Sequence, residues 1–200
     1  MQALDDMALL RLTLTRGPGN RGYTPDAVGR PTVLLTLHPA PRPAHSAGWS
    51  LVTSSFRIPG ADPLSMFKTT SKILQIMARA EAVAKGADEA LLLNTNGDVA
   101  ETAGGNLFWI HQGRICTAPA EFGVLPGITR AVVLEICQDL GLPTGEPVIR
   151  PPALKHAEGL FVTQSGLGIA PVAMFDGEPV PRSPRVAQIA AGYDERLARE

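Results

Sequence analysis

Apolar and polar positions alternate along several short runs of this chain, and that alternation predicts β-strands. Residues 9–16 alternate Leu with Arg or Thr, the period of a half-buried strand, and residues 32–37 form a second candidate. Apolar runs at residues 49–53, 106–110 and 161–163 are further candidates, and the run at 106–110 is apolar enough to be central in a sheet. The chain is therefore predicted to be rich in strands.

Three segments follow the spacing of an amphipathic helix instead. The first spans residues 71–85 and has its apolar stripe at Ile73, Leu74, Met77, Ala80 and Ala84. The second spans residues 128–140 and repeats that pattern, with Val132, Val133 and Ile136 facing inward. The third begins at Ser183-Pro184, an N-cap followed by Pro at the first helical position, and runs to the end of the chain.

A hairpin is predicted between two of these segments, and it brings a carboxylate into the sheet. The apolar run at residues 90–93 leads to an Asn96-Gly97 turn and a returning strand that reaches Glu101. An unpaired charge between buried strands is costly, so Glu101 needs a partner. A cationic ring nitrogen of a cofactor would be one partner. Alternatively, Glu101 caps a turn or pairs with an Arg.

Composition and charge narrow the class of protein. The hydrophobic fraction is 44%, the net charge is −1, and Lys and Arg are dispersed, so neither nucleic acid nor a membrane surface is an expected partner. No apolar run approaches the roughly 20 residues that span a bilayer, and no signal peptide opens the chain. Cys116 and Cys137 lack metal-ligand spacing and are expected to be free thiols in a reducing, cytoplasmic compartment.

The histidines and the nucleophile motifs point to no chemistry. The four histidines are scattered along the chain at His38, His45, His111 and His156. Their spacing suggests neither a metal site nor a nucleophile–base pair, and the Gly-x-Ser-x-Gly elbow is absent around Ser165. We therefore predict no metal site.

The loop Gly17-Pro18-Gly19-Asn20-Arg21-Gly22 matches the sequence of the dinucleotide-binding pattern Gly-x-Gly-x-x-Gly but not its expected structural context. That fingerprint must open a helix, and the Pro residues at 18 and 25 favour an irregular loop. Arg21 is better placed to bind a substrate carboxylate through its fork of donors. A solvated loop Arg is the alternative.

One lysine and two small anion sites are the remaining candidates for chemistry. Lys68 follows a turn-rich stretch and opens an amphipathic segment, so its amine is expected at a strand-to-helix junction. Gly127-Ile128-Thr129 lies at a predicted helix N-terminus, where N–H groups and the helix dipole attract an anion. Ser165 lies in a Gly-rich turn after a strand. Taken singly, Thr129 and Ser165 are equally consistent with capping residues.

Taken together, these groups are what a protein needs to hold pyridoxal 5'-phosphate. The amine of Lys68 can form a Schiff base with the cofactor aldehyde, Glu101 can keep the pyridine nitrogen protonated, and Gly127, Ile128, Thr129 and Ser165 can bind the phosphate.

Five blocks of the chain, in this order, resemble the class IV aminotransferase family. They are residues 67–72, 86–93, 99–109, 123–130 and 163–172. The resemblance implies an α/β (α+β) chain of fold type IV, with a large pseudo-barrel domain that binds pyridoxal phosphate. It also implies a homodimer whose sites lie close to the subunit interface, and an amine as the small-molecule substrate.

Within the family, the segment from Leu10 to Tyr23 resembles that of 4-amino-4-deoxychorismate lyase. In that enzyme the base removes a proton from the amine-bearing carbon, pyruvate leaves, and 4-aminobenzoate forms for folate biosynthesis; the resemblance gives the base role to Lys68. The lyase and its relatives usually have Asn three residues after the cofactor lysine, and Ser71 stands there in this chain, which leaves the subtype open. A branched-chain or D-amino-acid aminotransferase is therefore the alternative within the family.

The resemblance also implies a division into domains. Residues 1–38 match the C-terminal part of a small α/β domain, the Pro-rich residues 39–47 an interdomain linker, and residues 48–200 the large cofactor-binding domain. Two strands cannot form an independent domain, and family members ordinarily begin with a longer segment. We therefore expect about the first third of the enzyme to be missing, through a misassigned start, a fragment or a natural truncation.

Two other hypotheses follow from that expectation. The chain could be a truncated, inactive homologue that binds the cofactor weakly or only scaffolds a complex. It could also be an unrelated small-molecule binding domain, in which case replacing Lys68 would leave binding unaffected.

Overall fold

The computed structural model describes residues 8–24, 29–40 and 48–199. The chain divides into two compact units, Met1–Arg42 and Pro43–Glu200. Most of the predicted linker, residues 41–47, lies outside the described residues.

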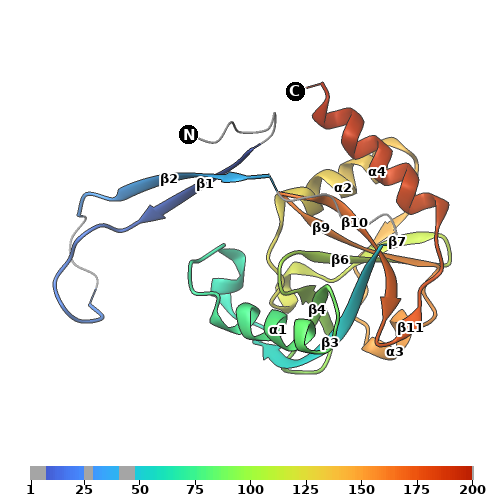
Figure 1. The fold of residues 1–200 in the computed structure, drawn as a ribbon, viewed down its shortest axis with the longest axis horizontal. Coiled ribbons are helices and arrows are strands. Elements are labelled where there is room, and N and C mark those ends of the chain that lie inside the picture. The colour runs from blue at the N-terminus through green and yellow to red at the C-terminus, as the bar shows by residue number, and fades with distance from the viewer. Residues whose placement is uncertain (1–7, 25–28, 41–47, 200) are drawn as a thin grey trace. The chain divides into compact units, whose positions relative to one another are not determined.

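The first unit is an antiparallel hairpin of β1 (Ala8–Thr15) and β2 (Thr32–Pro39), paired without a register shift from Ala8↔Pro39 to Thr15↔Thr32 (Figure 1). Directly paired residues share a face of the ribbon. One face therefore carries only aliphatic side chains, all exposed: Leu10, Leu12, Leu14, Val33, Leu35 and Leu37. Both strands were predicted, but the half-burial of the first was not found, because no second layer covers the hairpin within the described residues of this unit.

The second unit is built on one nine-stranded sheet. Its strands are β3 (Trp49–Ile58), β4 (Glu89–Asn94), β5 (Val99–Thr102), β6 (Asn106–His111), β7 (Arg114–Thr117), β8 (Thr144–Gly145), β9 (Gly159–Gln164), β10 (Gly168–Phe175) and β11 (Glu178–Pro179). Their order is β5-β4-β3-β10-β9-β6-β7-β8, with β11 beside β10. The sheet curls, so that β5 at one end also contacts β6, and the Thr102 N–H donates to the Gly105 carbonyl at 2.8 Å.

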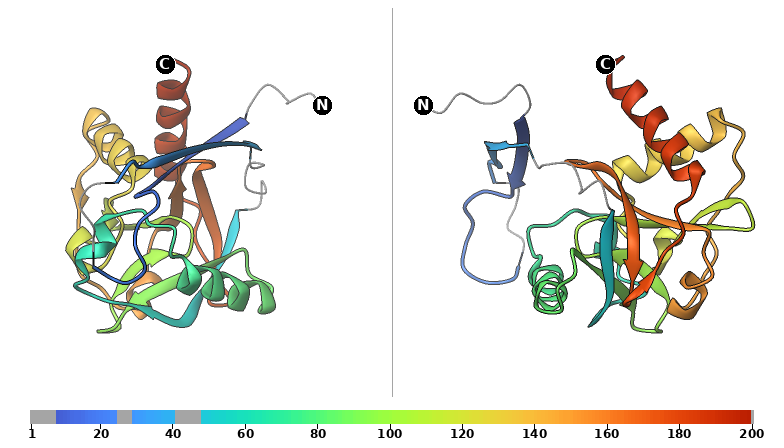
Figure 2. Two further views of the ribbon diagram at one scale, coloured as in Figure 1. Left: turned by 90° about the vertical axis from the view of Figure 1, so that its left-hand side faces the viewer. Right: turned by 45° about the vertical axis from the view of Figure 1, so that its right-hand side comes forward.

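Helices cover the sheet in two places (Figure 2). The helices are α1 (Ile73–Ala84), α2 (Ile128–Asp139), α3 (Pro151–Leu154) and α4 (Pro184–Leu197), with 3-10 turns η1 (Pro63–Met66) and η2 (Ala120–Phe122). The helix α1 packs on β3 and β4, whereas α2 and α4 pack on each other and on β9. Buried clusters under both places hold the unit together, and the rings of Phe108 and Phe161 stack at 4.9 Å between centroids in the cluster beneath α2 and α4.

One predicted helix turns a different face to the core. The predicted apolar stripe of α1 is divided: Ile73 and Met77 are exposed, Leu74 packs against a buried cluster, and Ala78 and Ala82 are the residues buried against the sheet. Small residues allow the helix to approach β3 and β4 closely, and Glu81 fixes it there by accepting a hydrogen bond from the Ser54 hydroxyl at 2.6 Å. The inward side of α2 was predicted correctly, with Val133 and Ile136 buried.

Candidate active site

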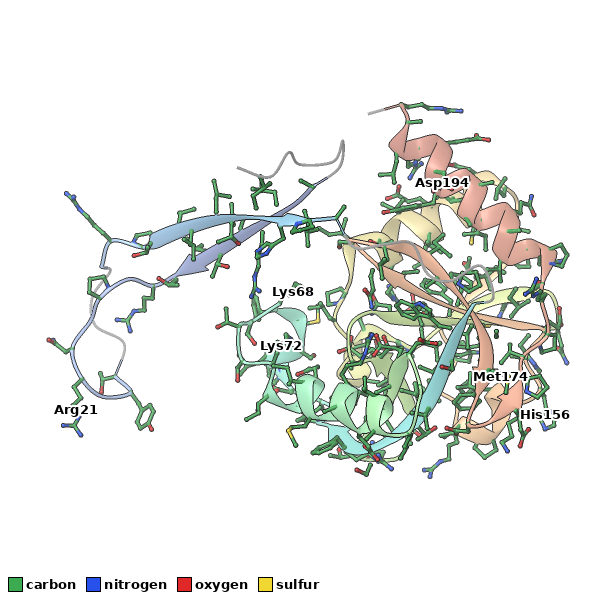
Figure 3. All side chains as sticks on the ribbon, viewed as in Figure 1. Arg21, Lys68, Lys72, His156, Met174 and Asp194 are labelled. Atoms are coloured by element: carbon green, nitrogen blue, oxygen red, sulfur yellow. The ribbon has the colours of Figure 1, made fainter. Side chains whose placement is uncertain are left out.

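Lys68 lies between η1 and α1, on the connection from β3 (Figure 3). The side chain of Asp62 begins the 3-10 turn by accepting a hydrogen bond from the Leu64 N–H at 2.9 Å. The Phe67 N–H closes it on the Leu64 carbonyl at 3.0 Å. These bonds fix the backbone next to Lys68, whose side chain is exposed. The strand-to-helix junction expected for this amine is therefore present.

Glu101 lies on β5, opposite Leu92 of β4. Its Oε2 accepts a hydrogen bond from the Leu125 N–H at 3.0 Å. Burial raises the pKa of Glu101 to about 7, while the Leu125 N–H and the charges of Lys72 and Lys68 act in the opposite direction. Both amines are thus close enough to act electrostatically on this carboxyl group.

Lys72 was not singled out in the sequence. It is the N-cap residue of α1 and comes four residues after Lys68. Its charge acts on Glu101 more strongly than that of Lys68 does. The fixed spacing of two lysines at the start of a helix was the one signal that could have identified it.

The backbone before α2 is held against Glu101 by a second side chain. Asn106 Nδ2 donates to the Leu125 carbonyl at 2.9 Å, while Glu101 accepts from the N–H of the same residue. A Cβ atom at Gly127 would lie 2.2 Å from Asn106 Oδ1, so only glycine allows this approach. Gly127 is the N-cap of α2, and no side chain caps the helix. The N–H groups of its first turn are therefore available to an anion.

A buried hydroxyl group lies next to Asn106. Thr163 pairs directly with Asn106 across β9 and β6, so the two side chains share a face of the sheet. Its Oγ1 is buried and has no hydrogen-bond partner within the described part of the chain. An unsatisfied hydroxyl is costly, and a ligand that accepted its hydrogen bond would remove that cost. Ser165, two residues further on, is exposed in the turn between β9 and β10.

Gln164, between Thr163 and Ser165, connects the turn between β9 and β10 to Glu89 on β4. Gln164 Nε2 donates to Glu89 Oε2 at 3.3 Å, and the same carboxylate pairs with Arg79 of α1. A Cβ atom at Gly104 would lie 2.8 Å from Gln164 Nε2, so this side chain also packs under the turn that follows β5. Burial raises the pKa of Glu89, whose side chain is fully inaccessible. This network was not predicted from the sequence.

The predicted site residues thus fall into two groups. Around Glu101 the structure gathers Lys68 and the Gly127–Thr129 turn, where Thr129 is buried and Ile128 is exposed. Arg21 is exposed on the connection between β1 and β2 in the first unit, and its role in substrate binding stays a prediction.

Metal-ligand clusters and membrane-spanning helices are absent from the described ranges. No group of three or more His, Cys, Asp and Glu side chains there could hold a metal ion. None of the described helices is long and apolar enough to cross a membrane. Cys116 and Cys137 are free thiols, as predicted, and both are buried.

The class IV aminotransferase family matches residues 2–175 of this chain. A protein of Methanocaldococcus jannaschii that carries the name of a branched-chain-amino-acid aminotransferase is 32% identical over 191 residues, which cover 95% of this chain and 66% of the relative. The aminodeoxychorismate lyase of Vibrio harveyi is 31% identical over 175 residues, covering 84% and 64%. The T.th. branched-chain amino acid aminotransferase, solved with pyridoxamine 5'-phosphate, superposes with a TM-score of 0.86 at 31% identity, covering 95% and 64%.

The chain therefore belongs to the class IV aminotransferase family, and the fold expected from its five sequence blocks is confirmed. It spans slightly less than two thirds of the length of these curated relatives. The site residues fit the cofactor that the family uses. Glu101 is partly buried with a raised pKa, its Oε1 has no hydrogen-bond partner among the described residues, and the first turn of α2 is uncapped.

Proposed function

We propose that this protein is a pyridoxal phosphate-dependent 4-amino-4-deoxychorismate lyase, which releases pyruvate and forms 4-aminobenzoate for folate biosynthesis. The observation that carries the cofactor proposal is the partly buried carboxyl group of Glu101, which accepts a hydrogen bond from the Leu125 N–H before α2 and lies within electrostatic reach of Lys68 and Lys72. A cationic partner stabilises the ionised form of a carboxyl group whose pKa is near 7, and a protonated pyridine nitrogen is such a partner.

The residues of this chain would divide the work of holding the cofactor. Glu101 would keep the ring nitrogen protonated, and the first turn of α2 with Thr129 and Ser165 would bind the phosphate. Lys68 would anchor the aldehyde carbon. Pyridoxal phosphate supplies an electron-withdrawing ring that stabilises negative charge at the amine-bearing carbon.

Lys68 would then carry the proton. Its free amine would take the proton from the amine-bearing carbon of the substrate. Glu101 does not exchange protons with the substrate in this scheme. Its part is to remain negative next to a positive ring nitrogen, and the N–H of Leu125 supports that charge.

The choice of the lyase rests on the Leu10–Tyr23 segment and on the similarity to the Vibrio harveyi enzyme. The second candidate is a branched-chain or D-amino-acid aminotransferase. The Methanocaldococcus jannaschii relative favours it. A truncated, inactive homologue is the third reading. Lys68 and Glu101 serve the first two reactions alike, so the substrate pocket decides between them.

A product assay separates these readings. The purified protein is incubated with pyridoxal phosphate and 4-amino-4-deoxychorismate, and pyruvate and 4-aminobenzoate are measured. Parallel reactions contain a branched-chain or a D-amino acid with 2-oxoglutarate, and Lys68→Ala is the matched control. We expect both lyase products, and none with the variant. Glutamate formation without pyruvate would replace the lyase by an aminotransferase, and no product in any reaction would favour the inactive homologue.

We further propose that the protein works as a homodimer in the cytoplasm. A reducing compartment agrees with its two buried free thiols, Cys116 and Cys137.

A further inference from the structure

The segment from η1 to the end of α1 exposes large apolar side chains. In twenty consecutive residues, seven such side chains are 48–74% exposed: Leu64, Met66, Phe67, Ile73, Ile76, Met77 and Val83. Large apolar residues scattered singly over a surface need no explanation, but a contiguous group marks an interaction site.

On α1 these residues form one face. Positions 73, 77, 80 and 84 follow each other at spacings of three and four, so they lie along one side of the helix. Ile76 and Val83 flank that stripe, and the buried Ala78 and Ala82 lie on the opposite side, against the sheet. The outer face therefore carries no charged residue between Lys72 and Lys85.

The nearest charges on α1 are already engaged elsewhere. Arg79 pairs with the buried Glu89, and Glu81 accepts hydrogen bonds from Ser54 and from Lys85. Both residues thus turn toward the sheet or its edge. This leaves the outer face of α1 as an apolar surface with polar residues at its borders.

The size of this surface suits a dimer. On the outer face of α1, the four large side chains Ile73, Ile76, Met77 and Val83 are exposed by about half or more and offer on the order of 300 Å² of apolar surface. A stable interface buries about 800 Å² per partner, a little more than half of it apolar. The face therefore supplies most of the apolar part of one side of such an interface.

The order of residues along the face favours a second copy of the same helix. Along the central stripe, the large side chains Ile73 and Met77 lie in the N-terminal half and the small ones Ala80 and Ala84 in the C-terminal half, while Ile76 and Val83 border the stripe. Two copies related by a two-fold axis and running antiparallel place Ile73 opposite Ala84 and Met77 opposite Ala80, so large side chains meet small ones along the whole contact. A parallel pair would place large on large and small on small.

We propose that α1 packs antiparallel against α1 of a second copy of this chain, through the face formed by Ile73, Met77, Ala80 and Ala84. This assigns a surface to the homodimer of the proposed function. Lys68 lies five residues before Ile73, so the contact would end beside the candidate active site.

Cysteine cross-linking tests the direction of the helices. Chains with Ile73→Cys and chains with Ala84→Cys are mixed under mild oxidation, and covalent dimers are measured on a non-reducing gel. We expect dimers in the mixture and far fewer with either chain alone. Cys116 and Cys137 are buried and remain as a constant background. Dimers of Ile73→Cys alone, as abundant as in the mixture, would overturn the antiparallel arrangement.

Sedimentation velocity tests the surface itself. We expect the unmodified protein to be a dimer at tens of micromolar and Met77→Arg to be at least ten-fold weaker in association, because two like charges would meet near the axis. The matched control is Leu12→Arg, on the exposed apolar face of the β1–β2 hairpin, which should still dimerise. A monomeric unmodified protein, or a dimer lost with Leu12→Arg and kept with Met77→Arg, would overturn the proposal.

The failure of this inference can be told from a failure of the cofactor site. The absorption spectrum with added pyridoxal phosphate reports on the site, and sedimentation reports on the contact. A protein that binds the cofactor at Lys68 but remains monomeric refutes the α1 contact and the proposed homodimer, and leaves the proposed cofactor site standing.

Discussion

At the scale of single residues, Glu101 is where burial and charge oppose each other most directly. It lies between Leu92 on the neighbouring strand and the N–H of Leu125, with two lysines near it. Burial is the larger influence and raises its pKa to about 7. Such a carboxyl group is only partly ionised near neutral pH, and a nearby cation favours its negative form, which suits a site that binds a protonated ring.

The first prediction concerns the stability of the protein against pH. Glu101 loses its proton near its ordinary pKa of 4.5 when unfolded, and near 7 when folded. Between these values the folded state holds a proton that the unfolded state has lost, so this group makes stability fall as pH rises from about 4.5 to about 7. The difference corresponds to about 3 kcal/mol. Urea unfolding at pH 5 and pH 8 measures it.

The matched control for that experiment is Glu101→Gln, which keeps the shape and cannot ionise. We expect the variant to lose this part of the pH dependence and to gain stability relative to the unmodified protein at pH 8. Equal pH dependence in both proteins would show that the carboxyl group titrates as it does in the unfolded chain.

The second prediction separates the two lysines. Removing the positive charge of Lys72 removes an influence that lowers the pKa of Glu101, so the titration of Glu101 should move to higher pH in Lys72→Met. Lys72→Arg retains the charge and should shift it little. Carbon NMR of the labelled carboxyl group measures both. An unchanged midpoint in Lys72→Met would mean that this amine is directed away from Glu101.

At the scale of elements, α1 is attached to the sheet by small residues and by one carboxylate. Glu81 accepts from the Ser54 hydroxyl at 2.6 Å, from the Ser55 N–H at 2.9 Å, and from Lys85 at 2.8 Å. These hydrogen bonds lower the pKa of Glu81 to about 2, and the one from Lys85 has the largest effect. A helix that buries mainly alanines depends on such a tie more than a helix with a large apolar contact does.

The third prediction follows from that tie. Glu81→Gln should lower the free energy of unfolding at pH 7 by about 1–2 kcal/mol, because hydrogen bonds to a charged acceptor become bonds to a neutral one. The contribution of Glu81 is present above pH 4.5 and is lost as pH falls toward 2, so the variant should be less sensitive to acid. Glu135→Gln, which removes an exposed ion pair with Arg196, is the control and should change little. Equal losses in the two variants would contradict this account of α1.

Most elements of the large unit could be predicted from the sequence, because local patterns specify them. The Asn96-Gly97 turn and the apolar run before it predicted β4 and β5, and Gly127 marked the start of α2. The packing face of α1 could not be predicted, because most of its apolar stripe faces outward. The Glu89–Gln164 contact could not be predicted either, since it joins residues 75 positions apart through the curl of the sheet.

At the scale of the whole molecule, the two units differ in how they are stabilised. All three buried clusters lie within the second unit, between Trp49 and Tyr193. The first unit is a hairpin of two strands with an exposed aliphatic face. A two-stranded hairpin alone is marginally stable in water.

The fourth prediction is that the two units exchange their amide hydrogens at different rates. Amides of β1 and β2 should exchange rapidly, through local opening of the hairpin. Those of β6 and β9 should exchange slowly, because they require global unfolding. Hydrogen exchange followed by mass spectrometry resolves the two. Equal protection would mean that another surface covers the hairpin in solution.

The measurement that tests the central claim most directly is covalent trapping of the cofactor. The protein is incubated with pyridoxal phosphate, reduced with borohydride and digested, and the modified peptide is identified by mass spectrometry. We predict that the reduced cofactor is attached to Lys68, that Lys68→Ala abolishes the label, and that Lys72→Ala retains it. A label on Lys72 alone, or a label spread over exposed lysines and unchanged in Lys68→Ala, would contradict the proposed site.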